Sequence, residues 1–185
     1  CDLPLIKYVA SKNKPILMST GMASFEEIED AISIAKENGC EKLFLFHCIS
    51  SYPAPLEDTN LKNINFLRKK FDIEVGLSDH TIGNTAAIVA VALGASAIEK
   101  HFTLDKTKIG MDNQMALEPE EMSQLVKYCN NVHKAIGGKE RIILQAETEQ
   151  KKLMRRSVVS SKDLKAGKKL VKADLDVKKI GRAHV

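Results

Sequence analysis

The sequence lacks tryptophan, has only three tyrosines, and contains no apolar run long enough to cross a bilayer. Its longest purely apolar stretches, such as residues 86–93, are far shorter than a membrane-spanning helix requires. The first residues also lack the basic segment followed by an apolar segment that indicates a signal peptide. We therefore expect no membrane-embedded segment. The scarcity of aromatic side chains for base stacking argues against nucleic-acid binding as well.

No CxxC pair occurs among the four cysteines, and two of them lie in apolar surroundings, where a reduced thiol behaves as a small hydrophobic group. This pattern favours a reducing compartment, and we expect a cytoplasmic protein. The formal net charge of +4 is modest, and most basic residues alternate with acids along the chain. A weakly positive charge suits an anionic small-molecule substrate.

Four short β-rich runs recur along the chain, and each is followed by a helical pattern. This alternation predicts an α/β fold of parallel strands connected by crossover helices. The predicted strands are Pro15 to Ser19, Lys42 to Cys48, Ile73 to Leu77 and Ser96 to Phe102.

Helix start and stop signals locate three of the helices. In the first, Ser24 and Glu27 form a capping box before an apolar stripe, and Gly39 follows the end. The second is almost wholly apolar over residues 84–93, which predicts burial on most sides. The third spans residues 119–137 and begins with proline and acidic residues, which suit a helix N-terminus.

Residues 4–10 have helical character before the first strand, so the chain opens on a helix whose own strand is missing. Four βα units are half of a (βα)8 barrel, which typically needs about 250 residues. We therefore predict that residues 1–144 are the C-terminal half of a TIM barrel, with an open doubly wound sheet as the alternative. Residues 145–156 are interpreted as a linker, and residues 157–185 as the start of a small β-rich domain.

Each predicted strand ends in polar residues. Ligands of α/β folds bind at the carboxyl ends of the strands, so these polar ends indicate one shared site. The four segments are Ser19-Thr20-Gly21, His47 to Tyr52, Ser78-Asp79-His80-Thr81 and Glu99-Lys100-His101-Phe102.

His80 and His101 follow adjacent predicted strands, so two imidazoles can reach one ion while other coordination positions stay open. Such a site suits Lewis-acid chemistry by Mn²⁺, Mg²⁺ or Zn²⁺. The alternative is a pair of hydrogen-bonded histidines at a polar rim. A Ser-His-Asp triad within residues 78–80 is disfavoured, because neighbours in an extended strand point apart.

Small and polar side chains near the strand ends are further candidates for ligand binding. Ser19, Ser50 and Ser78 could surround a phosphate together with backbone N–H groups, or could be ordinary turn serines. Tyr52 lies in a stiff Tyr-Pro-Ala-Pro loop, where it could cover the site or pack on the proline rings. Asp112 could bind sugar hydroxyls or could be a solvated turn acid.

Five ordered motifs give the chain a specific resemblance to the sialic acid synthase family, which includes N-acetylneuraminate, legionaminate and pseudaminate synthases and a spore-coat polysaccharide relative. The resemblance covers nearly the whole chain. The motifs are Ser19-Thr20-Gly21-Met22, Tyr52-Pro53-Ala54-Pro55, Gly76 to Thr81, Leu93-Gly94-Ala95 and Glu99-Lys100-His101-Phe102.

The resemblance implies an enzyme that condenses phosphoenolpyruvate with the open-chain aldehyde of an N-acetylated hexose, such as N-acetylmannosamine, to give a nine-carbon 2-keto acid and phosphate. By this resemblance, the metal ligands are His80 and His101, with Mn²⁺ or Mg²⁺ as the cofactor. The phosphoenolpyruvate-binding positions are Ser19, Ser50 and Ser78. Of these, Ser50 stands where relatives carry asparagine. Sugar-binding positions are Tyr52 and Asp112.

The tail from Arg156 to Gly167 is similar to the start of the antifreeze-like (SAF) domain that follows the barrel in this family. There an Arg-Pro-Gly segment reaches the sugar site of the partner subunit, and this sequence has Lys179-Ile180-Gly181 instead. The resemblance implies a homodimer with an exchanged SAF domain, in which Lys179 contacts the sugar.

Two other classes remain open. One is a different barrel synthase that condenses phosphoenolpyruvate with another aldehyde, although the Tyr52 loop and the SAF-like tail argue against it. The other is an inactive truncated or binding module. The resemblance implies that the other half of the barrel supplies basic residues for phosphoenolpyruvate, so we expect residues 1–185 alone to be inactive.

Overall fold

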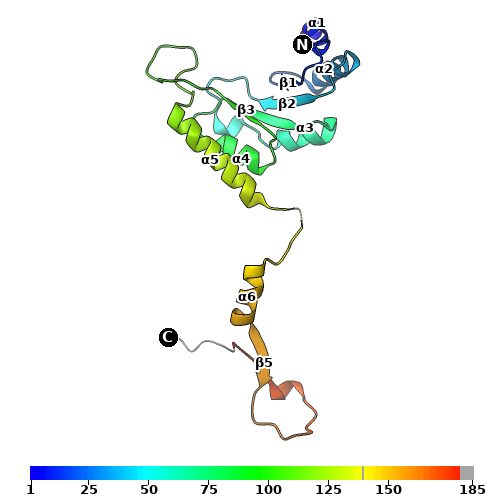
Figure 1. Cartoon of the computed structure of the whole chain (residues 1–185), viewed down its shortest axis with the longest axis vertical. Helices are drawn as coiled ribbons and strands as arrows, with labels where there is room; N and C mark the ends of the chain where they lie inside the picture. Colours follow the sequence, from blue (N-terminus) through cyan, green and yellow to red (C-terminus); the bar gives the residue numbers. More distant parts are fainter. Residues whose placement is uncertain (139, 180–185) are drawn as a thin grey trace. The chain divides into compact units, whose positions relative to one another are not determined.

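The computed structural model describes residues 1–138 and 140–179. The chain divides into two compact units, Cys1–Gly137 and Gly138–Val185, and each is described by itself (Figure 1). No helix within the described residues combines the length and the apolar character needed to span a bilayer.

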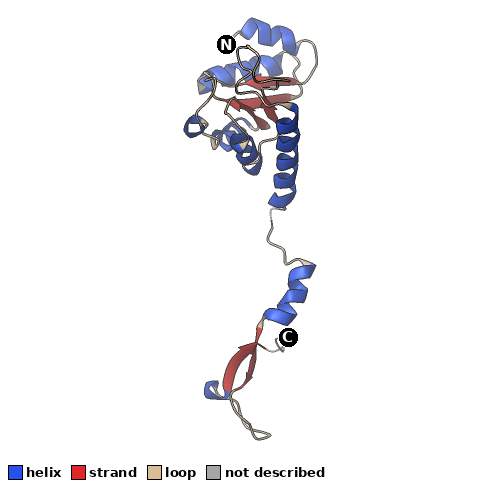
Figure 2. Ribbon diagram, turned by 90° about the vertical axis from the view of Figure 1, so that its left-hand side faces the viewer, coloured by secondary structure: helices blue, strands red, loops and turns tan. Residues whose placement is uncertain are grey.

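The first unit is built on a four-stranded parallel sheet in the order β1-β2-β3-β4. The strands are β1 (Ile16–Ser19), β2 (Leu43–Cys48), β3 (Val75–Asp79) and β4 (Ile98–Lys100), drawn red in Figure 2. The helices are α1 (Leu3–Ala10), α2 (Phe25–Glu37), α3 (Asn63–Phe71), α4 (Thr85–Ala92) and α5 (Pro119–Ile136), with a short 3₁₀ helix, η1 (Leu56–Asp58). The strict alternation of strand and helix confirms the predicted α/β class.

The two faces of this sheet have different neighbours. Side chains of successive strand residues point to opposite faces, and Leu45, Val75 and Leu77 pack with the apolar sides of α2, α3 and α4 in the main core. On the other face, Leu17 is 59% exposed, and Glu99 is also exposed. The helices therefore cover one face, and no described residue packs over Leu17 and Glu99 on the other.

The predicted limits of α2 and α4 agree closely with the structure. The Ser24 hydroxyl accepts from Glu27 N–H at 3.3 Å, and the Glu27 carboxylate accepts from Ser24 N–H at 2.7 Å, so the predicted capping box is present. Asn84 precedes α4 as predicted, but its side chain makes no capping hydrogen bond. Three buried alanines, Ala86, Ala87 and Ala90, let α4 pack closely on its neighbours.

Helix α3 and two strand boundaries differ from the sequence-based expectation. The three helices located from the sequence do not include α3, which buries only Ile64 and Leu67 and has three consecutive basic residues in its last turn, so its apolar stripe is short. Strand β3 begins and ends two residues later than predicted. Strand β4 is shorter than the predicted run, because only Ile98–Lys100 pair with β3.

The second unit contains α6 (Gln145–Met154) and an antiparallel pair, β5 (Arg156–Ser160) and β6 (Leu175–Lys179), with a short 3₁₀ helix, η2 (Lys172–Asp174), before β6. The Asp174 side chain is buried, and its Oδ1 lies 2.5 Å from Lys168 Nζ and 3.2 Å from Lys162 Nζ. The hydrogen bond from Lys168 is the main cause that lowers the pKa of Asp174. Asp174 thus connects the loop between the strands to the start of β6. The assignment of this unit to a SAF domain stays a prediction.

Candidate metal and substrate site

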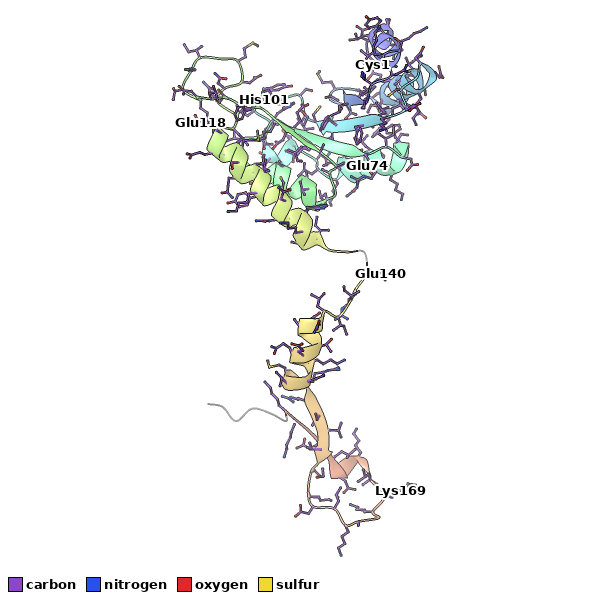
Figure 3. All side chains as sticks on the ribbon, in the orientation of Figure 1. Cys1, Glu74, His101, Glu118, Glu140 and Lys169 are labelled. Atoms are coloured by element: carbon purple, nitrogen blue, oxygen red, sulfur yellow. The ribbon has the colours of Figure 1, made fainter. Side chains whose placement is uncertain are left out.

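The predicted aromatic and histidine residues come together at the carboxyl ends of the strands. The ring centroids of His80 and His101 are 5.4 Å apart. The Tyr52 ring lies 4.3 Å from the His80 ring and 5.9 Å from the His101 ring. Figure 3 labels His101, just after β4, and Glu74, just before β3, which lie at opposite ends of the sheet. The structure therefore assembles these three predicted residues in one place.

The hydrogen bonds of His80 determine which ring nitrogen can bind an ion. His80 Nδ1 lies 2.8 Å from the Ile49 carbonyl oxygen, which only accepts, so Nδ1 carries the proton in the neutral ring. His80 Nε2 lies 3.2 Å from the Ser78 hydroxyl, which donates its single proton to Glu99 Oε1 at 2.7 Å. The lone pair of Nε2 therefore stays available. A carbonyl partner of this kind fixes the tautomer of metal-ligating histidines in general.

His101 lies at the more open side of the site. Its Nδ1 is 3.7 Å from Asp112 Oδ2, so the predicted sugar-binding acid also belongs to this cluster. The loop after His101 returns to the strand end at Leu117. There Leu117 N–H donates to the His101 carbonyl at 2.8 Å, and Thr103 N–H donates to the Leu117 carbonyl at 3.0 Å. These two bonds place Asp112 beside the histidine.

The donor set fits an open coordination site. Within the described residues, no group of three or more His, Cys, Asp or Glu side chains has the arrangement of a complete metal cage. Two imidazoles and several positions for water or substrate suit a weakly held, exchangeable divalent cation better than structural zinc, which takes four protein ligands.

The loops after β1 and β2 approach each other closely at the same end of the sheet. A Cβ atom added to Gly21 would come within 2.5 Å of Ser50 Oγ and 2.8 Å of Cys48 Sγ, so any larger residue there would force these side chains to shift. In the adjacent strand pair, Cys48 aligns with the buried Ser78. Ser19, the last residue of β1, is exposed. The three predicted serines thus lie at successive strand ends, and their phosphate role stays a prediction.

Cys48 also lies within this group of residues, but its thiol is not reactive. Burial raises the pKa of the Cys48 thiol, although the backbone N–H groups of Gly21 and Thr20 act in the opposite direction. The thiol is therefore protonated at neutral pH and behaves as a small apolar group.

The Asp79–Lys100 pair is a feature of the site to which sequence reasoning assigned no role. Lys100 Nζ lies 2.8 Å from Asp79 Oδ2 and donates to the Thr81 carbonyl at 2.6 Å. Both charged side chains are only 1% exposed. In the sequence, an acidic residue directly precedes His80 and a basic residue directly precedes His101. Their pairing could be predicted only with knowledge of the strand register.

Lys179, the remaining predicted sugar contact, lies in β6 of the second unit, where it is exposed and aligned with Arg156. The structure therefore does not test its proposed contact with the sugar. The following Ile180 and Gly181, together with residues 182–185, lie outside the described part of the chain.

A buried histidine, His47, predicts a measurable pH dependence of stability. Burial lowers the pKa of His47, and the hydrogen bond from its Nε2–H to the Thr59 carbonyl at 2.7 Å opposes this only in part. Below about pH 6.5 the unfolded histidine takes up a proton that the folded one resists, so the free energy of unfolding falls as the pH falls. We expect urea midpoints to decrease from pH 7 to 5.5, and to decrease less in His47→Gln. Exposed His133→Gln is the control, and equal slopes in all three proteins would contradict this assignment.

The sequence pattern of the NeuB family matches residues 1–141 of the chain. The chain belongs to the NeuB family. Named relatives include the N,N'-diacetyllegionaminic acid synthase of Campylobacter jejuni subsp. jejuni serotype O:2, which is 40% identical over 96% of this chain and 54% of its own length. The pseudaminic acid synthase of C. jejuni serotype O:23/36 is also 40% identical, over 90% of this chain and 48% of its own length. This chain thus spans about half the length of the curated relatives it matches.

A solved structure supports the architecture of this NeuB family chain. The N-acetylneuraminic acid synthetase of Leptospira borgpetersenii serovar Hardjo-bovis, crystallised with citrate, superposes with a TM-score of 0.77 at 36% identity, covering 82% of this chain and 53% of that one. The match confirms the predicted resemblance and the curled half-barrel sheet of a partial TIM barrel.

Proposed function

We propose that this NeuB family chain carries the metal-binding half of a synthase that condenses phosphoenolpyruvate with an N-acetylated hexose to form a nine-carbon 2-keto sugar acid. The observation that supports the proposal best is the convergence of His80 and His101, with ring centroids 5.4 Å apart, at the carboxyl ends of two parallel strands. The relatives named legionaminic and pseudaminic acid synthases are enzymes that make acidic sugars, which supports the proposal.

The proposed reaction joins C3 of phosphoenolpyruvate to the aldehyde carbon of the sugar. Water then replaces phosphate at C2, so the products are the 2-keto acid and inorganic phosphate. Lewis-acid polarisation of the aldehyde oxygen is the chemistry that a divalent cation, Mn²⁺ or Mg²⁺, supplies when bound here. His80 contributes Nε2 to that site because its Nδ1–H is engaged by the Ile49 carbonyl. Tyr52 lies against both rings and limits the access of water from its side.

The serines and Asp112 are assigned to the two substrates. In this proposal Ser19, Ser50 and Ser78 donate hydrogen bonds to the phosphate of phosphoenolpyruvate, because they occupy successive strand ends on one side of the sheet. On phosphate binding the Ser78 hydroxyl turns its single proton from Glu99 to the phosphate, so the lone pair of His80 Nε2 stays available. Asp112 accepts from a sugar hydroxyl beside His101. We also propose a cytoplasmic homodimer in which Lys179 of one subunit contacts the sugar bound by the other.

Loss of the Ser78 hydroxyl is expected to weaken phosphoenolpyruvate recognition. A hydrogen bond to a charged group contributes about 1.5–3 kcal/mol, so Ser78→Ala in the full-length protein should raise the KM for phosphoenolpyruvate roughly tenfold to a hundredfold. The KM for the sugar should change much less. Ser96→Ala, which alters a serine at the opposite end of the sheet near Glu74, is the control. A larger effect on the sugar KM would move Ser78 to the sugar site.

Phosphate release tests the proposed function as a whole. The full-length protein, stripped of metal and then supplied with Mn²⁺, is incubated with phosphoenolpyruvate and a panel of N-acetylmannosamine and its modified relatives. We expect phosphate release only when both the cation and one of these sugars are present. Release that is independent of the sugar, or that occurs with none of the panel, would contradict the proposal.

A further inference from the structure

The buried ion pair of Asp79 and Lys100 connects the ends of β3 and β4 directly behind the two histidines. Asp79 and Lys100 are register partners in the parallel ladder, and each immediately precedes a histidine in the sequence. Successive strand residues point to opposite faces, so the charged pair lies on the helix-covered face while the histidines extend from the other. The side chain of Lys100 is 1% exposed and points away from the open face, so it cannot reach a ligand there.

Lys100 contacts the residues on both sides of His80 in the sequence. Lys100 Nζ binds the carboxylate of Asp79, the residue before His80, and the carbonyl of Thr81, the residue after it. The second oxygen of Asp79 accepts from Thr81 N–H at 2.9 Å, which closes the turn around His80. One ammonium group, one residue before His101, therefore binds the side chain of the residue before His80 and the backbone carbonyl of the residue after it.

A buried ion pair is an unfavourable choice if the residues serve only to pack β3 against β4. Removing two charges from water opposes folding, and apolar residues of similar volume often serve stability equally well, so stability alone does not account for this buried pair. Strand β4 has only three paired residues, so its ladder alone restrains the position of His101 weakly.

We propose that Asp79 and Lys100 are positioning residues that set the separation and ring orientation of His80 and His101. The inference rests on the proposed function, in which these histidines bind the cation. Neither charged residue contacts substrate or cation. Their effect passes through the backbone of residues 79–81 and through the strand register that places His101 beside His80.

The test removes the ion pair while keeping the fold. In the full-length protein, Asp79→Asn combined with Lys100→Met eliminates both charges, and the asparagine oxygen can still accept from Thr81 N–H. Mn²⁺ affinity is measured from the electron paramagnetic resonance signal of free Mn²⁺. We expect the Kd for Mn²⁺ to rise at least about tenfold, as for other residues that orient metal ligands.

A matched control separates positioning from general destabilisation. Leu67→Ala shortens a buried side chain of α3 in the main core. It lowers stability but keeps both charges of the ion pair. Its Mn²⁺ affinity should equal that of the wild-type protein. A Kd for the double variant that does not exceed that of Leu67→Ala would overturn the proposal.

A second readout needs no metal and keeps this inference separate from the proposed function. In metal-free protein with ¹⁵N-labelled histidine, the ring spectrum of His80 should show the Nδ1–H tautomer in the wild type and a mixture in the double variant. If His80→Ala leaves Mn²⁺ affinity unchanged, the metal assignment fails, and the ring spectrum alone decides the positioning role. An unchanged His80 spectrum in the double variant would then refute it.

Discussion

Replacing either histidine, His80→Ala or His101→Ala, is expected to abolish metal-dependent turnover of the full-length protein. In the proposed site each supplies one of the two imidazoles that the described residues bring together, so the remaining ring would hold the cation too weakly to keep the site occupied. Lewis-acid polarisation contributes several kcal/mol to transition-state stabilisation, which corresponds to a loss of roughly a thousandfold or more. Turnover is measured as phosphate release after chelator treatment and restoration with Mn²⁺.

Exposed His133 provides the matched control, because His133→Ala removes an imidazole of the same unit from α5 and leaves the strand ends intact. It should keep nearly full activity. Full activity of both strand-end variants under the same conditions would show that the cation is held elsewhere.

The second large effect concerns residues 1–185 as an isolated chain, which should catalyse no condensation even if it folds. Within the described residues, β1 and β4 each pair on one side only, and Leu17 and Glu99 lie on a face that no described residue covers. Unpaired strand edges and exposed apolar surface favour self-association. Substrate positioning and charge stabilisation also remain incomplete without the other elements of a barrel.

Light scattering combined with the phosphate-release assay checks this expectation. We expect oligomers without turnover when purified residues 1–185 are given phosphoenolpyruvate, N-acetylmannosamine and Mn²⁺. A monomer that turns over at a rate near that of a complete relative would contradict the half-barrel interpretation.

Local signals predicted the parts of this structure that depend on neighbouring residues. The Ser24–Glu27 capping box located α2, because both partners lie within one helical turn. The polar strand ends predicted the cluster of Tyr52, His80 and His101, because parallel strands bring their carboxyl ends to one edge of the sheet.

Features that depend on register or tertiary packing were not predictable in the same way. The Asp79–Lys100 pair joins residues 21 positions apart, and it forms only because Asp79 aligns with Lys100 in the ladder. The close approach of Gly21 to Ser50 depends on how two loops fold over each other. Helix α3 is held by the burial of Ile64 and Leu67 in the core, which its short apolar stripe did not reveal.

The most direct test of the account follows the new carbon–carbon bond. The full-length protein with Mn²⁺ is given [3-¹³C]phosphoenolpyruvate and [1-¹³C]N-acetylmannosamine, or whichever sugar of the panel supports phosphate release, and the product is examined by ¹³C nuclear magnetic resonance. We expect a one-bond ¹³C–¹³C coupling between the two labelled carbons in a nine-carbon 2-keto acid, and its loss in His80→Ala. Labelled carbons that remain unconnected while phosphate is released would contradict the proposed condensation.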